Sequence, residues 1–152
     1  MSEWGTKQAM AIEVETKDCT AISDAEIAEM ADLCTESPNA FEVGLLSKQC
    51  EEWVLVTVAS ESGKIRGFSF CTLERIGGTP SLLIGAGHIC RNTKRDTVLR
   101  AIMTDQLRRA VLAFPDEDVL VGCQMNDPGV FEAFKSLDGI VPRPDHKASG
   151  EE

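Results

Sequence analysis

Several residues and motifs that would mark a membrane segment, a metal site or a nucleophile are missing from this chain. No apolar run approaches the ~18 residues of a membrane-spanning helix. The first residues show no basic segment followed by an apolar one, so we expect no signal peptide. The only histidines are His88 and His146, and no two of the six cysteines form a Cys-x-x-Cys pair. We therefore expect no metal, and a cytoplasmic chain whose cysteines are reduced core residues.

Common catalytic and nucleotide-binding signatures are also absent. The chain has no Gly-x-Ser-x-Gly elbow, no Gly-x-Gly-x-x-Gly and no P-loop pattern. His88 and Cys90 are two residues apart and would share one face of a strand. We interpret them as a strand histidine beside a packed cysteine, because a catalytic cysteine needs a base aimed at it.

Length and charge limit the classes of partner. A chain of 152 residues that is 43% apolar fits one domain, which we place at 12–140 between a flexible N-terminus (1–11) and a flexible tail (141–152). Acidic residues outnumber basic ones 25 to 15, a net charge of −10. This balance argues against nucleic acid or an anionic membrane as the main partner.

The charge is unevenly distributed. Residues 1–60 carry 12 acidic and 3 basic side chains, whereas Arg91 to Arg109 carries six basic and two acidic ones and is net +4. A solvated helix face is one explanation of the basic stretch, and an anion site is the other.

The first half of the chain predicts one strand followed by two helices. Alternation over 12–16 indicates a strand, and Ser23 to Glu26 forms a capping box before a helix. A second helix is expected over 40–51. We expect its buried side to carry Phe41, Leu45 and Leu46.

The second half predicts three strands joined by short turns, and then a crossover. The strands are expected at 53–59, 65–73 and 82–90, with turns at 61–64 and 77–80 and with Phe68 and Phe70 on one face. A helix over 95–114 should bury a stripe of five apolar residues: Leu99, Met103, Leu107, Val111 and Phe114. A strand over 119–123, parallel to a neighbour, and a last helix over 128–137 with Val130, Phe131 and Phe134 inward complete the order β-α-α-β-β-β-α-β-α. The fold class is α/β (α+β), a mixed and mostly antiparallel sheet flanked by helices.

The passage from the 82–90 strand into the long helix is the best candidate for a binding site. A helix start presents four backbone N–H groups without helical partners and about half a positive charge. Arg91, Lys94 and Arg95 add three cations there. The segment therefore indicates an anion site, although Asp96 or Thr97 capping the helix is an alternative.

This element order resembles the GNAT acyltransferase family over residues 12–138. In that family the corresponding loop reads Arg/Gln-x-x-Gly-x-Gly/Ala, and here it reads Arg91-Asn-Thr-Lys94-Arg-Asp96. The arginine is kept, while Lys94 and Asp96 replace the two small residues. The resemblance implies that acetyl-CoA or another acyl-CoA is bound as a substrate. It implies eight contacting residues: Ile89, Cys90, Arg91, Lys94, Arg95, Asp96, Thr97 and Asn126.

The resemblance also implies roles in proton transfer. Glu74, on the second strand of the meander, is the candidate general base. Many members carry a tyrosine as general acid on the last helix, but this chain has no tyrosine and Phe134 stands at the matching position. Water, Cys123 or His88 would have to replace it. The acceptor would be a small-molecule or peptide amine, and an acidic rim from the first third of the chain would attract a cationic one.

The end of the chain departs from the family pattern, because only residues 139–152 follow the last expected helix, where family members usually have two more strands. The 119–123 strand would then have an open edge. A partner chain (as in a homodimer), the tail, or a longer protein would cover it. Three functions stay open: an acyl-CoA-dependent N-acyltransferase, a non-catalytic GNAT-like ligand-binding or protein-interaction module, and an unrelated domain that binds another phosphate compound.

Overall fold

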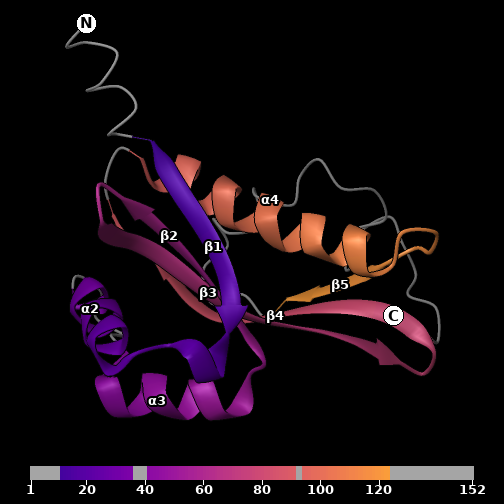
Figure 1. The fold of residues 1–152 in the computed structure, drawn as a ribbon, viewed down its shortest axis with the longest axis horizontal. Helices are drawn as coiled ribbons and strands as arrows, with labels where there is room; N and C mark the ends of the chain where they lie inside the picture. Colours follow the sequence, from indigo (N-terminus) through magenta and orange to yellow (C-terminus); the bar gives the residue numbers. More distant parts are fainter. Residues whose placement is uncertain (1–10, 36–40, 92–93, 124–152) are drawn as a thin grey trace, which may run out of the picture.

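A computed structural model describes residues 11–35, 41–91 and 94–123 of the chain. Figure 1 labels the strands and the α-helices within these ranges, and the elements follow one another along the chain. They are β1 (Ile12–Asp18), the short 3-10 helix η1 (Cys19–Ala21), α2 (Asp24–Cys34), α3 (Val43–Glu52), β2 (Leu55–Glu61), β3 (Lys64–Ile76), β4 (Thr79–Ile89), α4 (Arg95–Ala113) and β5 (Leu120–Cys123). The expected helix over 128–137 and the tail over 141–152 lie outside the described residues, as do residues 1–10.

The five strands form one sheet in the order β1-β2-β3-β4-β5. The first four pair antiparallel and β5 pairs parallel to β4, which confirms the predicted meander and crossover. Positive φ angles at Ser62 (51°) and Gly63 (78°), and again at Gly77 (58°) and Gly78 (87°), produce the two tight hairpin turns. The second turn is shorter than predicted, since β4 already begins at Thr79.

Helix α2 forms as the sequence predicts. The Ser23 side chain accepts a hydrogen bond from the Glu26 N–H, and the Glu26 carboxylate accepts one from the Ser23 N–H, so the capping box is present. Ile27, Met30 and Cys34 are buried on the side that faces the sheet.

Helix α3 corrects one predicted core residue. Leu46 is fully buried, but Leu45 is 43% exposed. Adjacent residues are about 100° apart around a helix axis, so the one-sided contact of a short helix buries one and leaves the other in solvent. Phe41 precedes the helix and meets Phe68 edge to face, with ring centroids 6.5 Å apart.

Helix α4 has its predicted bounds but a different buried stripe. Val111 is 60% exposed, and the buried residues are Val98, Leu99, Ile102, Met103, Asp105, Gln106 and Ala110. A step of four residues advances about 40° beyond a full turn, so the expected spacing of 4, 4 and 4 carries residue 111 about 120° away from residue 99. The observed stripe mixes steps of three and four and stays on one side.

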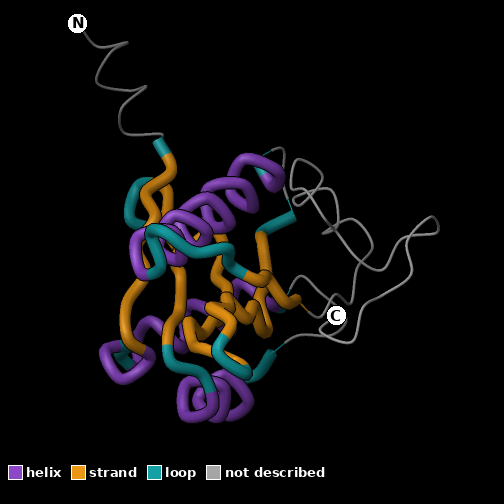
Figure 2. The backbone as a smooth tube through the Cα atoms, turned by 90° about the vertical axis from the view of Figure 1, so that its right-hand side faces the viewer, coloured by secondary structure: helices purple, strands orange, loops and turns teal. Residues whose placement is uncertain are grey.

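The sheet separates two apolar layers, as Figure 2 shows with α2 and α3 on one side and α4 on the other. Phe68 and Phe70 are fully buried in the α2–α3 layer, with their rings 6.0 Å apart. Leu82 and Ile84 pack with Leu99 under α4. None of the described helices is long and apolar enough to cross a membrane.

Candidate functional site

The basic loop lies between the end of β4 and the start of α4. Cys90 is buried, and its N–H donates to the Arg66 carbonyl at 2.8 Å, which fixes the exit of the strand. Lys94 occupies the N-cap position, and its side chain makes no capping hydrogen bond. Neither Asp96 nor Thr97 takes that position. Backbone N–H groups of the first turn therefore face the loop without a side-chain cap from Lys94, as an anion site requires.

A buried carboxylate that sequence reasoning missed lies beside this loop. Glu61, at the end of β2, is 8% exposed, and its carboxylate forms an ion pair with the Lys94 Nζ. The Arg66 Nε lies 3.6 Å from the same carboxylate. The sequence offered only a glutamate at a turn, and nothing local indicates a partner 33 positions further on. The Glu61–Lys94 pair joins the start of α4 to the β2–β3 hairpin.

Two other loop residues reach into solvent. Asp96 has an 86% exposed side chain, with the Arg95 Nη1 3.9 Å from its carboxylate. Arg91 is exposed just after β4. Water screens exposed charges strongly, so the Asp96 carboxylate weakens the positive potential of the loop less than a buried acid would.

The last two basic residues of the stretch lie far from the loop and interact with a different carboxylate. Arg108 and Arg109 lie about 20 Å along α4 from its start, at 1.5 Å per residue. The Arg108 Nη2 donates to Asp105 at 2.9 Å, and the Arg109 Nε lies 3.5 Å from the same carboxylate. The net charge of +4 counted from the sequence therefore does not gather at one point.

Asp105 is the centre of a buried polar cluster between α4 and the sheet. Its carboxylate, 7% exposed, accepts a hydrogen bond from the Thr16 hydroxyl, which also lies 2.7 Å from the Thr57 hydroxyl. The Arg109 Nη2 donates to the Thr16 carbonyl at 2.9 Å. These contacts tie α4 to β1 and β2.

Strand β4 extends beyond its described pairing with β5 and contains an irregularity at that point. Parallel pairing runs from Ser81↔Leu120 to Ile84↔Cys123, yet β4 continues to Ile89. At the same point the register with β3 shifts, because Ser69 faces Gly87 while Cys71 faces Ile84. Two residues, 85 and 86, thus stand opposite Phe70 as a β-bulge. Over 85–89 the backbone edge on the β5 side has no strand partner among the described residues.

The bulge is covered by an aromatic ring. A Cβ atom on Gly85 would lie 2.3 Å from Cζ2 of Trp53, so only glycine permits this contact. The Trp53 indole N–H donates to the Gln49 side chain at 3.0 Å, which holds the ring against the strand. The pair Gly85 and Gly87 inside one strand is a sequence signal of a bulge or a close approach that could have indicated this feature.

The proton-transfer candidates do not all gather at this point. Glu74 is exposed and pairs with Ser81, four residues before Gly85, or about 14 Å along the strand. His88 pairs with Phe68 beyond the bulge. Burial raises the pKa of the Cys123 thiol at the end of β5. Asn126 and Phe134 lie outside the described residues.

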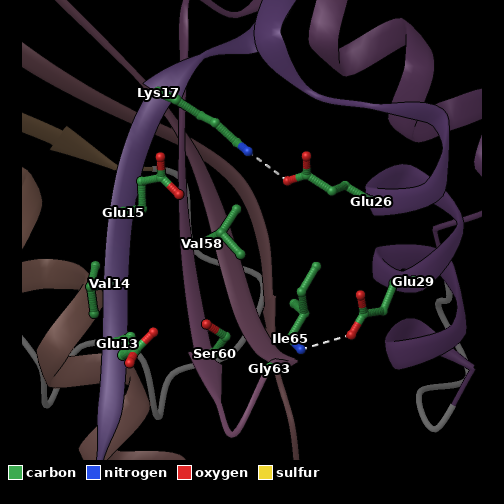
Figure 3. A pocket seen from close by; sticks show the side chains of 10 residues that line it. All are labelled: Glu13, Val14, Glu15, Lys17, Glu26, Glu29, Val58, Ser60, Gly63 and Ile65. Carbon is green, nitrogen blue, oxygen red and sulfur yellow. Dashed lines mark hydrogen bonds and ion pairs between the residues drawn. The ribbon is translucent and has the colours of Figure 1, made fainter.

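A pocket of about 320 Å³ opens between β1 and α2. Figure 3 shows two glutamates from β1 facing two from α2 above the β2–β3 hairpin. The Lys17 Nζ lies 2.7 Å from Glu26, and Glu29 accepts the Ile65 N–H at 2.8 Å. The carboxylates are Glu13, Glu15, Glu26 and Glu29, against one lysine.

The pKa of Glu26 shows how this pocket treats charge. Partial burial pushes the pKa of the carboxyl upward, but the Lys17 ammonium and the Ser23 hydrogen bonds outweigh it and leave the pKa below its ordinary value. Glu26 is therefore negative at neutral pH, and the pocket suits a cation. No group of three or more His, Cys, Asp or Glu side chains within 11–35, 41–91 and 94–123 is arranged to hold a metal ion.

Comparison with solved structures identifies the fold as that of the GNAT N-acetyltransferases. A ribosomal-protein-alanine N-acetyltransferase from Brucella melitensis biovar Abortus 2308 superposes with a TM-score of 0.64 and 9% identity, over 91% of this chain and 99% of that one. An aminoglycoside acetyltransferase from an uncultured soil metagenomic sample, in complex with sisomicin, gives 0.62 and 15% over 91% and 95%. The aminoglycoside N-acetyltransferase AAC(6')-Iy in complex with CoA gives 0.62 and 10% over 93% and 96%. The sequence itself matches no family model and no curated protein.

Proposed function

We propose that the protein is an acyl-CoA-dependent N-acyltransferase that transfers the acyl group of acyl-CoA directly to an amine. The observation that carries the proposal is that, among the described residues, β5 pairs with β4 only as far as Ile84, while β4 runs on past the bulge to Ile89, shortly before the basic N-terminus of α4. An extended ligand that ends in phosphates would lie along the backbone edge of β4 and place its phosphates at the start of α4. The shared fold with acetyltransferases supports the same conclusion.

The loop residues are compatible with phosphates. The backbone of Arg95, Asp96 and Thr97 opens α4, and Arg91 and Lys94 supply cations beside it. Ile89 and Cys90 end the strand edge that would accompany the ligand. The Lys94 side chain makes no capping hydrogen bond at the helix start, which favours an external anion in that place.

In this scheme the chain contributes binding and polarisation. Bound acyl-CoA supplies a thioester carbonyl that an amine attacks. Backbone N–H groups of the 85–89 edge would donate to the carbonyl oxygen as it gains charge. Glu74 is the proposed base, acting through water because of its separation from Gly85. Water, Cys123 or His88 would return a proton to the leaving thiolate.

The acceptor in this proposal is a small-molecule or peptide amine with a positive charge. The acidic pocket between β1 and α2 supports that choice because four glutamates face one lysine there. A protonated amine would have to lose its proton before attack, which is the work of the base.

A non-catalytic GNAT-like binding module is the second candidate. One observation favours it: Glu61 already forms an ion pair with Lys94, the cation at the N-cap of α4. A loop whose lysine is engaged would bind phosphates less tightly than the fold alone suggests.

Thermal melting with acetyl-CoA, CoA and ATP tests the proposal. A ligand at 100 times its Kd stabilises the folded chain by about 2.7 kcal/mol. For a chain of this length the melting midpoint should rise by roughly 5–10 °C. Arg91→Glu and Lys94→Glu should each reduce the shift, whereas Lys48→Glu, the same charge change on an exposed α3 residue, should leave it intact.

Two outcomes separate the candidates. No shift with millimolar acetyl-CoA would refute the acyltransferase proposal. A shift without thiol release across a panel of mono- and polyamines would instead support the binding module.

A further inference from the structure

Two cysteines on different elements meet on the α2–α3 side of the sheet. Cys19, in η1, belongs to the apolar core of the α2–α3 layer, and Cys50, near the end of α3, packs against the same core, where the pKa of each thiol responds to the other. The backbone supports the same juxtaposition, since the Cys19 N–H donates to the Val54 carbonyl at 2.9 Å, four residues past Cys50. All six cysteines of the chain are free thiols.

The two thiols differ in access. Cys19 is 4% exposed inside the core, whereas Cys50 is only partly buried at its border. An external reagent would therefore reach Cys50 before Cys19.

We propose that Cys19 and Cys50 form a redox modification site, which closes into an intramolecular disulfide when a low-molecular-weight disulfide acts as oxidant. The Cys50 thiolate attacks one sulfur of the oxidant and forms a mixed disulfide, which releases one thiolate. The Cys19 thiolate then attacks the Cys50 sulfur and releases the second. Two protein thiols and one disulfide thus become one protein disulfide and two small thiols, which take up the two protons.

The environment makes this reaction slow at neutral pH. Burial raises the pKa of Cys19 to about 12 and also raises that of Cys50, although the Cys19 thiol acts to lower the latter. The attacking species is the thiolate, so the rate should increase with pH. The site would respond to a sustained oxidising environment and not to a brief pulse of oxidant.

The cross-link would constrain α3, the helix that precedes the ring covering the β4 bulge. It joins η1 to α3, and α3 leads directly into Trp53, the ring that covers Gly85 at the bulge. A bond between residues 19 and 50 closes a loop of about 30 residues and removes freedom mainly from the unfolded chain. The inference does not depend on acyl transfer, because it concerns only the thiols.

The test compares the full chain incubated at pH 8.5 with oxidised or with reduced glutathione, then quenched with N-ethylmaleimide. We expect the unlabelled oxidised protein to be about 2 Da lighter, and the quenched sample, once denatured, to carry two fewer maleimide adducts than the six of the reduced sample. Its melting midpoint should rise by roughly 5–15 °C and return after reduction. Cleavage must follow Glu as well as Lys and Arg, because Lys17 and Lys48 bound one peptide that contains both Cys19 and Cys34.

Variants make the outcome decisive. Cys50→Ser and Cys19→Ala should each abolish the 2 Da loss, and Cys123→Ser should retain it. A stable glutathione adduct on Cys50 without the internal bond, or a cross-linked peptide pair that lacks Cys19 or Cys50, would overturn the proposal. Because Cys50 is only partly buried, Cys50→Ser should still fold if Cys19→Ala does not.

Discussion

Replacement of Asp105 by alanine should weaken the attachment of α4 to the sheet. The change removes the acceptor of the Thr16 hydroxyl and of Arg108, and the ion pair with Arg109. A hydrogen bond to a buried charged group contributes about 1.5–3 kcal/mol, whereas exposed ion pairs contribute about 1 kcal/mol or less. The arginine side chains are 69% and 44% exposed and can rehydrate, and Thr16 keeps Thr57. We expect a loss of about 2–3 kcal/mol in the free energy of unfolding.

Urea unfolding followed by far-ultraviolet circular dichroism measures this loss. Asp105→Asn keeps an acceptor for Thr16 and should cost about half as much, while Asp96→Ala, at an 86% exposed position, should stay within about 0.5 kcal/mol of the wild type. The melting midpoint of Asp105→Ala should fall by roughly 5–10 °C. If Asp105→Ala proves as stable as Asp96→Ala, the cluster does not hold α4 and the reasoning fails.

Three further changes test other features. Gly85→Ala should cost about 1–3 kcal/mol because its Cβ would overlap the Trp53 ring, and much less in a Trp53→Ala background; equal costs in a double-mutant cycle would contradict the contact. Ser62→Asn should raise the melting midpoint by about 1–3 °C, because asparagine tolerates the positive φ of 51° better than serine. Burial raises the pKa of Cys19 to about 12, so the folded protein holds this proton more tightly than the unfolded chain. The free energy of unfolding should therefore fall as pH rises from about 9 toward 12, and Cys19→Ser should flatten that slope in urea titrations between pH 8 and 10.5.

Local rules explain the part of the fold that could be predicted. The capping box at Ser23, the glycine-bearing hairpin turns and the β-branched run Val56–Val58 each act through neighbours in the sequence. The spacing of short turns and one long helix then leaves few topologies, which is why the antiparallel meander and the parallel β5 were predictable.

The arrangement of charge could not be predicted, because it depends on partners far apart in the sequence. Glu61 and Lys94 meet only after β3 and β4 have formed, and Thr16 reaches Asp105 across 89 positions. A count of +4 over one helix contains no information about which guanidinium groups turn toward a buried acid.

The stretch of β4 beyond its described pairing with β5 has a consequence for hydrogen exchange. Alternate amides over residues 85–89 point away from β3, toward the side on which no strand partner lies among the described residues. They should exchange with solvent faster than their neighbours in the same strand, so that the strand has a fast and a slow edge. Any ligand that binds along this edge as a strand would do should slow the fast set alone, a protection pattern with a period of two residues that needs no knowledge of the acceptor.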